Sequence, residues 1–355
     1  MKSPSSIFSS DTLKLHFGVP RGLLLAVGLL IAVETGISRR EWLYRVYPAS
    51  FVGSFLRCEN ELCRAAIPPQ IVIMGNSCSG EGLLPRVLER ELHLPEGAVL
   101  NLSVNAGSPY EARLFQRRNY EELKKVRLLI LGVDDFQFNR GLQSSEVFFH
   151  FSTLWERLRA QPTLEIVVGG VWRTFEMQRV YGNLWKAAQT RIARIGDQVF
   201  QRIGVLSAIV EDQPKSTPPR TDDIATANPL SSVGTSRPAF TMATEQLECL
   251  QQFLQTAWAA QQKVLLVQLP FRDTYMKALL ETRPADYENY KRSLNSLANG
   301  QTVFFEFGSA SGLQETDFSD SWHLTAAGAD KFTRVFARFL RDSKSDVLPQ
   351  LRMRE

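Results

Sequence analysis

The chain has 355 residues, 44% of them hydrophobic, and its 41 Lys and Arg residues exceed its 37 Asp and Glu residues by four. A disordered chain has less apolar content and a more uneven charge, and 22 Gly and 17 Pro residues are too few for a collagen-like scaffold. Four cysteines exclude a disulfide-dense mini-protein. A net charge of +4, with no basic stripe interleaved with aromatic residues, gives no reason to expect a nucleic-acid partner. We therefore expect one large globular domain or two small ones.

An apolar run extends from Gly22 to Val33 near the N-terminus, and basic residues precede it. It is shorter than the about 20 residues of a comfortable membrane span, and no series of such runs follows, which excludes a polytopic membrane protein. The run has no polar positions at helical spacing, so it lacks an exposed face. We favour a cytoplasmic tail and an uncleaved signal-anchor helix within residues 1–40. This would make the chain a single-pass protein of the inner or plasma membrane, with an extracytoplasmic (periplasmic) globular domain. A cleaved signal peptide and a buried core helix are the alternatives.

Two of the cysteines, Cys58 and Cys63, lie in the connecting segment 41–69 between the apolar run and the first predicted strand. A disulfide across a short loop there would fit an oxidising compartment. Two unrelated thiols are an equally weighted alternative. The spacing is not Cys-x-x-Cys and no histidine pair accompanies it, so we predict no metal site. We also predict no cofactor.

Short β-rich runs alternate with longer helical stretches from residue 70 onward. Strands are predicted at 71–75, 98–104, 126–133, 264–270 and 302–307, and helices at about 84–92, 112–124 and 325–340. Continuous apolar runs separated by helices are typical of a parallel sheet covered on both faces. Residues 70–345 are therefore predicted to form a three-layer α/β/α domain of doubly wound, flavodoxin-like type with a parallel five-stranded sheet.

An insertion at about 141–242 separates the third and fourth predicted strands. Its first part, 144–210, has helical and aromatic character, although the segment LEIVVGGVW could form a strand. The stretch 211–240 is rich in Pro, Ser, Thr and Asp. It is predicted to be a long flexible loop rather than a domain linker, because the sheet resumes after it.

Polar residues follow the predicted strands, at the edge where doubly wound sheets bind their ligands. They are Asn76 and Ser77 after the first strand, Asn105 and Gly107 after the second, Asp134 and Asp135 after the third, and Asp320 and His323 before the last helix. A serine, a turn that exposes backbone N–H groups and an Asp-x-x-His are the set that acyl transfer through serine requires. We predict Ser77 as the nucleophile, His323 as its general base and Asp320 as the carboxylate that orients His323. Capping of the following helices by Ser77 and Asp320 is the structural alternative.

Three segments carry a resemblance to a known family: Gly75–Ser77 (GNS), Asn101–Pro109 (NLSVNAGSP) and Asp320–Phe332 (DSWHLTAAGADKF). In this order they resemble the conserved blocks of the SGNH (GDSL-type) hydrolase superfamily, over about residues 70–340 with the insertion excepted. The resemblance implies an oxyanion hole formed by the N–H groups of Ser77 and Gly107, with Ala106 as the rival of Gly107. An N-terminal anchor before such a domain is similar to the extracytoplasmic SGNH-like proteins of alginate O-acetylation and lipoteichoic acid D-alanylation.

Two positions depart from the family's blocks. Asn76 stands where Asp is commoner, and Asp134 stands where the third block, Gly-x-Asn-Asp, has an asparagine that donates to the oxyanion. Losing one oxyanion donor costs about 2.7–4 kcal/mol. Three outcomes are open: Asp134 is protonated, it turns away, or it leaves the hole to the backbone N–H groups. Asn76, Asn105, Asp134 and Asp135 are therefore candidates for substrate contact only.

The resemblance leads us to predict an acyltransferase or esterase that acts on O-acyl esters of a cell-surface glycan or lipid. The membrane, through the N-terminal helix, and a polytopic membrane acyl-donor protein are the candidate partners. A catalytically silent SGNH-like protein that binds a glycan or scaffolds an envelope complex is the alternative, and Asp134 supports it. A soluble carbohydrate esterase with the N-terminal run packed on the domain is the third possibility.

Overall fold

The computed structural model describes residues 21–39, 41, 44, 50–139, 146–160, 164–173 and 242–342. The predicted flexible loop, 211–240, and the greater part of the insertion lie outside these residues.

A parallel sheet of five strands, in the order β2-β1-β3-β4-β5, forms the centre of the domain. The strands are β1 (Ile71–Met74), β2 (Val99–Asn101), β3 (Leu128–Gly132), β4 (Lys263–Gln268) and β5 (Thr302–Glu306). Every residue of β1 and of β3 is buried, which explains why their sequences are apolar without alternation. This order and direction confirm the predicted flavodoxin-like fold. The strands are shorter than predicted, although residues just beyond them still donate to neighbouring strands, Leu102 to the carbonyl of Ile73 and Val133 to that of Val267, both at 2.8 Å.

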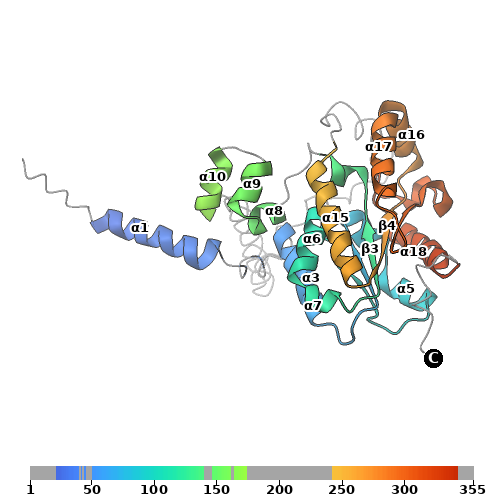
Figure 1. Ribbon diagram of the computed structural model, residues 1–355, viewed down its shortest axis with the longest axis horizontal. Helices are drawn as coiled ribbons and strands as arrows, with labels where there is room; N and C mark the ends of the chain where they lie inside the picture. Colours follow the sequence, from blue (N-terminus) through green and yellow to red (C-terminus); the bar gives the residue numbers. More distant parts are fainter. Residues whose placement is uncertain are drawn as a thin grey trace, which may run out of the picture.

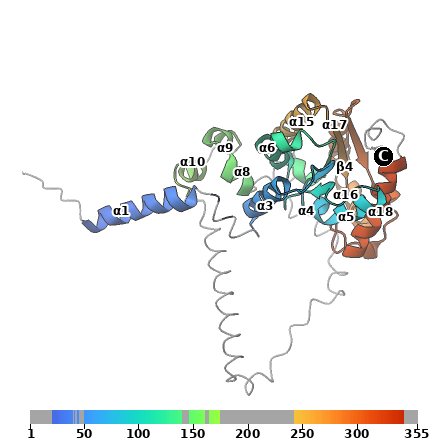
Figure 2. The ribbon, with the colours of Figure 1, turned by 90° about the horizontal axis from the view of Figure 1, so that it is seen from below.

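Helices cover both faces of the sheet, as Figures 1 and 2 show. On one face lie α3 (Phe51–Cys63), α6 (Pro109–Arg118) and α15 (Thr244–Ala259), and on the other lie α4 (Ser77–Gly82), α5 (Pro85–Glu91) and α18 (Ala326–Asp342). Alternate strand residues supply the two cores. Val72 packs in the first and Ile71 and Ile73 in the second. The chain also forms α7 (Tyr120–Leu123), α16 (Asp273–Thr282) and α17 (Pro284–Asn295).

Two of the predicted helices have different bounds. The stretch predicted at 112–124 is divided into α6 and α7 at Asn119, whose side-chain amide donates to the carbonyl of Phe115 at 3.0 Å. The one predicted at 84–92 is α5, which Pro85 begins, and the shorter α4 precedes it. Proline suits a first helical position because its missing N–H has no intrahelical acceptor there.

The structure decides two local alternatives that the sequence left open. The segment with Cys58 and Cys63 is helix α3 rather than the expected short loop, and the alternative of two unrelated thiols is confirmed, because both are free, Cys58 buried and Cys63 exposed. Residues five apart on a helix point in different directions, which is why the two sulfurs do not meet. For LEIVVGGVW the helical prediction is confirmed over the strand alternative, because Leu164–Val171 forms helix α10. Helices α8 (Glu146–Phe151) and α9 (Leu154–Ala160) precede it.

The apolar run near the N-terminus forms helix α1 (Arg21–Val33), which continues into a short π-helix, Glu34–Ser38. Helix α1 extends away from the sheet, and its leucines are exposed, Leu25 to 75%. The carboxylate of Glu34 is buried and accepts from Arg39 Nε at 2.8 Å and from the N–H of Arg173 at 2.9 Å. Within the described ranges, no single helix combines the length and the apolar character that crossing a membrane requires.

Candidate active site

Ser77, His323 and Asp320 lie in one hydrogen-bonded row beyond the carboxyl ends of the strands. Ser77 Oγ is 2.8 Å from His323 Nε2, and His323 Nδ1 is 2.7 Å from Asp320 Oδ2. Ser77 begins helix α4 directly after the β1 turn, whereas Asp320 and His323 lie in the loop before α18. All three residues are partly exposed, so a solute can reach them. The row has the order of groups that activates a serine hydroxyl: nucleophile, base and orienting carboxylate.

A tight loop presents the histidine and the aspartate. Phe318 and Leu324 pair as an antiparallel bridge at its base, and the N–H of Ser319 donates to the carbonyl of His323 at 2.9 Å. Within the loop, Asp320 Oδ1 accepts the N–H groups of Trp322 at 2.9 Å and of His323 at 2.7 Å. One carboxylate oxygen therefore holds the loop while the other holds the imidazole. Asp320 therefore has the orienting role and holds its own loop. The capping alternative is wrong for Asp320, because α18 begins at Ala326 and the side chain of Thr325 accepts the N–H of Gly328 there.

These contacts shift the pKa values of both groups. The hydrogen bond to Asp320 raises the pKa of His323 above its ordinary value, and outweighs a desolvation that lowers it. Burial alone would raise the pKa of Asp320, but the hydrogen bonds from the His323 ring and from the backbone N–H groups of Trp322 and His323 hold it below its usual range. Asp320 is therefore ionised at neutral pH, and it stabilises the protonated imidazole.

The turn that carries Ser77 requires glycine on two strands. Gly75 has φ +143°, a conformation that side chains rarely adopt, and a Cβ at Gly132 on β3 would lie 1.7 Å from Ser79 Oγ. Ser79 is completely buried between them, so α4 packs close to the ends of β1 and β3. This close packing places Ser77 at the edge of the sheet.

The two expected oxyanion donors differ in availability. Ser77 is the first residue of α4, where a backbone N–H has no intrahelical acceptor. The N–H of Gly107, in contrast, donates to the carbonyl of Val104 at 2.7 Å and closes a turn in which Ala106 has φ +53°. Because its N–H is engaged, Gly107 is not the available oxyanion donor and has another role. The N–H of its rival, Ala106, makes no hydrogen bond within the described part of the chain.

That role is close packing. A Cβ on Gly107 would lie 2.5 Å from the carbonyl oxygen of Gly75 and 2.7 Å from that of Val104. The N–H of Val104 also donates to the Gly75 carbonyl, at 3.0 Å. The turn after β2 is thus held directly against the turn that carries the nucleophile.

Asn76 and Asp134 contact each other beside the nucleophile. Asn76 Nδ2 donates to Asp134 Oδ2, and Asp134 is almost fully buried. Each side chain also caps its own helix: Asn76 Oδ1 accepts the N–H of Cys78 at 3.0 Å, and Asp134 Oδ1 accepts that of Gln137 at 3.1 Å. Three outcomes were open for Asp134: protonation, turning away, or leaving the oxyanion hole to backbone N–H groups. In the structure its carboxylate faces the side-chain amide of Asn76.

The other candidate residues do not join the row. Asn105 is exposed in the turn after β2, while Asp135 is buried in the 3-10 helix Asp135–Phe138. The thiol of Cys78 is buried, and its pKa is raised well above the ordinary value, first by burial and then by the carboxylates of Asp134 and Asp320. A thiol that stays protonated is a poor nucleophile, so Cys78 is a packing residue. Among the described residues, no group of His, Cys, Asp and Glu side chains could hold a metal ion.

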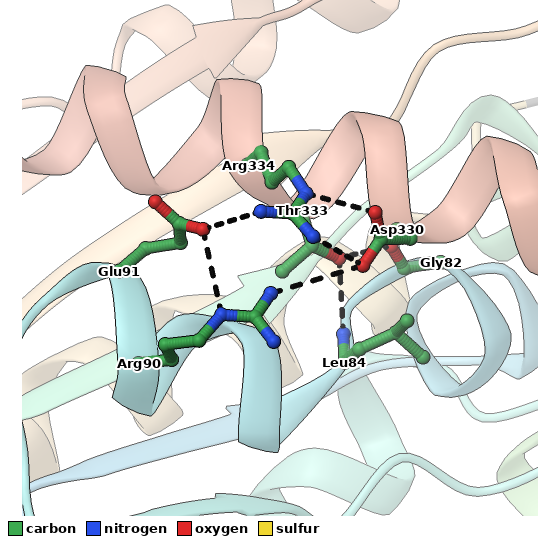
Figure 3. A network of polar contacts seen from close by, with 7 residues as sticks. All are labelled: Gly82, Leu84, Arg90, Glu91, Asp330, Thr333 and Arg334. Carbon is green, nitrogen blue, oxygen red and sulfur yellow. Dashed lines mark hydrogen bonds and ion pairs between the residues drawn. The ribbon is translucent and has the colours of Figure 1, made fainter.

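A contact between the helices that follow Ser77 and His323 escaped the sequence reasoning. Thr333 of α18 is completely buried, and its Oγ1 accepts the N–H of Leu84 at 3.1 Å and donates to the carbonyl of Gly82 at 3.2 Å. Figure 3 shows these bonds together with a surface group of ion pairs. In that group, Arg334 lies 2.7 Å from Glu91 and 2.8 Å from Asp330. A threonine at a core position of an amphipathic helix was the available signal, since a hydroxyl there needs a partner.

Gly328 in the last helix also has a structural explanation. A Cβ at this position would lie 2.1 Å from the carbonyl oxygen of Asp317. The carbonyl of Asp317 accepts the N–H of Thr325 at 2.9 Å, so the segment before the Asp320 loop lies directly against the start of α18. The fold and the row together define a class: an α/β domain of flavodoxin-like topology with a Ser-His-Asp arrangement at the carboxyl edge of its sheet.

Comparisons with known proteins add little to this description. No family profile matches the sequence, and no curated protein matches it. Among solved structures, the chain is similar to one titled "The structure of a putative platelet activating factor from Streptococcus pneumonia". The two share 11% sequence identity at a TM-score of 0.37, over 90% of this chain and 98% of the other. A similarity this low does not indicate a function for this chain.

Proposed function

We propose that this chain is an SGNH-like serine esterase or O-acyltransferase that acts on O-acyl esters of a cell-surface glycan or lipid. The observation that carries the proposal is the pair of distances in the row, 2.8 Å from Ser77 Oγ to His323 Nε2 and 2.7 Å from His323 Nδ1 to Asp320 Oδ2. Both lie within the reach that proton transfer requires before any rearrangement. The order of the three blocks along the chain supports the same class.

The chemistry begins with a proton transfer. His323 Nε2 takes the proton of Ser77 as Oγ attacks the carbonyl carbon of the ester, and Asp320 stabilises the imidazolium that forms. The negative charge on the carbonyl oxygen develops next to the N–H of Ser77. His323 then protonates the departing alcohol, which leaves an acyl group on Ser77. Water or an acceptor hydroxyl, deprotonated by His323, attacks this acyl group and restores the free serine.

A second candidate function is supported by the oxyanion donors. The N–H of Gly107 is engaged with Val104, and the side chain at position 134 is a carboxylate rather than an amide. Removing one oxyanion donor slows a serine enzyme about 10²- to 10³-fold. This observation favours a catalytically silent SGNH-like protein that binds a glycan or scaffolds an envelope complex.

One labelling experiment separates the two. A fluorophosphonate probe reacts with a serine only where a base activates it, so the proposed enzyme is labelled in the wild type and not in Ser77→Ala. Retained binding of an acylated glycan without labelling would reject the enzyme and support the silent protein.

We also propose that helix α1 anchors the chain in the inner or plasma membrane, with the sheet domain on the extracytoplasmic side. The exposed apolar side chains of α1 support this proposal, because burying them in lipid removes them from water. The acylated glycan or lipid, and a polytopic membrane acyl donor, are the proposed partners. The test is fractionation of the chain with and without residues 1–40. Membrane association of both forms, or of neither, would contradict the anchor.

A further inference from the structure

The contact between Asn76 and Asp134 joins the two loops that follow neighbouring strands. β1 and β3 are paired in parallel, with Met74 opposite Leu131, so the residues just beyond them meet at the same edge. Asn76 precedes the nucleophile, and Asp134 precedes the 3-10 helix Asp135–Phe138. The pair therefore fixes the loop with Ser77 against the neighbouring strand end.

The hydrogen bonds determine which group donates. Asn76 Oδ1 is occupied by the N–H of Cys78, so only its Nδ2 faces Asp134. Asp134 Oδ1 is occupied by the N–H of Gln137, so its Oδ2 faces Asn76. Each residue uses one oxygen to cap its own helix and the remaining atom for the other residue. An amide at one position and a carboxylate at the other gives one donor and one acceptor, so the hydrogen bond between the two side chains can form.

The same geometry accepts the two residues in exchanged positions. Asp and Asn are equally good N-caps, so either can hold either cap. An aspartate at 76 would cap with one oxygen and accept with the other, and an asparagine at 134 would cap with its oxygen and donate with its nitrogen. Two carboxylates would place acceptor against acceptor, and two amides would place donor against donor. The contact therefore tolerates the exchange and tolerates neither single change.

We propose that Asn76 and Asp134 form one reciprocal amide–carboxylate pair that positions Ser77, and that the chain's two departures from the family's blocks are a single compensated exchange. The inference rests on the proposed function of Ser77 as the nucleophile. Asp134 contacts Asn76, the residue before the nucleophile, and caps the 3-10 helix through the N–H of Gln137, so its proposed effect on Ser77 passes through Asn76 and it is a positioning residue. Its charge is one of the smaller influences that raise the pKa of His323, behind Asp320.

The test is a cycle of three variants: Asn76→Asp, Asp134→Asn and the double exchange. The single variants keep a capping oxygen at both positions and replace the amide–carboxylate contact between the two side chains. A hydrogen bond to a charged group corresponds to about 10- to 100-fold, so each single variant should lose that much in the rate of fluorophosphonate labelling. The double exchange should recover to within about threefold of the wild type, since its hydrogen-bond pattern is restored. Glu89→Gln is the matched control, because it changes another buried carboxylate. Glu89 lies in α5 and accepts the N–H of Val99 at 3.0 Å.

Unfolding in urea is measured on the same variants, and NMR titration of His323 provides a readout independent of turnover. Asp134→Asn should lower the pKa of His323, and the exchange should raise it again. Single variants that label as fast as the wild type, or an exchange that labels as slowly as they do, would overturn the inference. A wild type that is not labelled rejects the proposed function instead. In that case the reciprocal pair is supported if the double exchange restores both the unfolding midpoint and the pKa of His323 to their wild-type values. It is rejected if the double exchange does not.

Discussion

Replacing Thr333 by valine removes a buried hydroxyl that joins α18 to the end of α4. The side chain is completely buried, and valine keeps its shape. The N–H of Leu84 loses its acceptor at 3.1 Å and the carbonyl of Gly82 loses its donor at 3.2 Å. Only the bond to Gly82 is fully buried, and the N–H of Leu84 is partly buried, so we count one unsatisfied buried group, which costs about 1–3 kcal/mol. The added methyl group offsets up to about 0.8 kcal/mol. We therefore expect Thr333→Val to lower the free energy of unfolding by about 2 kcal/mol.

The assay is urea unfolding, in which the midpoint should fall while the slope stays unchanged. Thr333→Ser keeps the hydroxyl and loses only a methyl group, so it should cost about 1 kcal/mol. Arg334→Ala, next to it on the surface, should change the midpoint less than Thr333→Val, because an exposed ion pair is screened by water and salt. A change below about 0.5 kcal/mol for Thr333→Val, or a larger loss for Thr333→Ser, would show that these hydrogen bonds do not hold the two helices together.

Three further predictions concern the site and the thiols. The rate of labelling should rise with pH through a pKa above the 6.5 of an ordinary histidine, because the bond to Asp320 raises the pKa of His323 and only the neutral imidazole accepts the serine proton. Asp320→Asn should shift this rise in labelling rate to lower pH and slow the reaction by up to about 10⁴-fold. An unshifted rise would contradict the role of Asp320 as the residue that raises the pKa of His323. Gly107→Ala should disturb the turn at Ser77, since its Cβ would lie 2.5 Å from the Gly75 carbonyl oxygen, and labelling at the wild-type rate would refute this. In the native chain, Cys63 should react with a thiol reagent, whereas Cys58, whose pKa burial raises to about 12, should react only after unfolding.

The sequence predicts the centre of the sheet well because β1 and β3 are buried along their whole length. Runs such as Ile71–Met74 and Leu128–Gly132 are apolar throughout and short, a combination that few other elements have. The segment Leu164–Val171 is also largely apolar, with Glu165 as its one charged residue, and contains two valines in succession, yet it is a helix. An apolar run without alternation does not distinguish a strand from a helix by its pattern alone.

The sequence predicts those parts of the candidate site that depend on where a residue lies along the chain. It does not predict the parts that depend on which hydrogen bonds form. Ser77 and His323 follow from their places after β1 and before α18, because the carboxyl ends of parallel strands share one edge. The engaged N–H of Gly107 depends on a turn in which Ala106, not a glycine, has a positive φ. The contact between Asn76 and Asp134 depends on which side-chain atom of each residue remains after the other has capped a helix. The residue types alone do not predict which atom that is.

Trapping the acyl-enzyme tests directly whether Ser77 carries the acyl group. The wild-type chain is incubated with a chromogenic acetyl ester, quenched in acid, digested and analysed by mass spectrometry. We expect an acetyl group on the peptide with Ser77 in the wild type, and none in Ser77→Ala or in His323→Ala. Ester cleavage by the wild type with no acylated Ser77 peptide, or undiminished cleavage by Ser77→Ala, would contradict it.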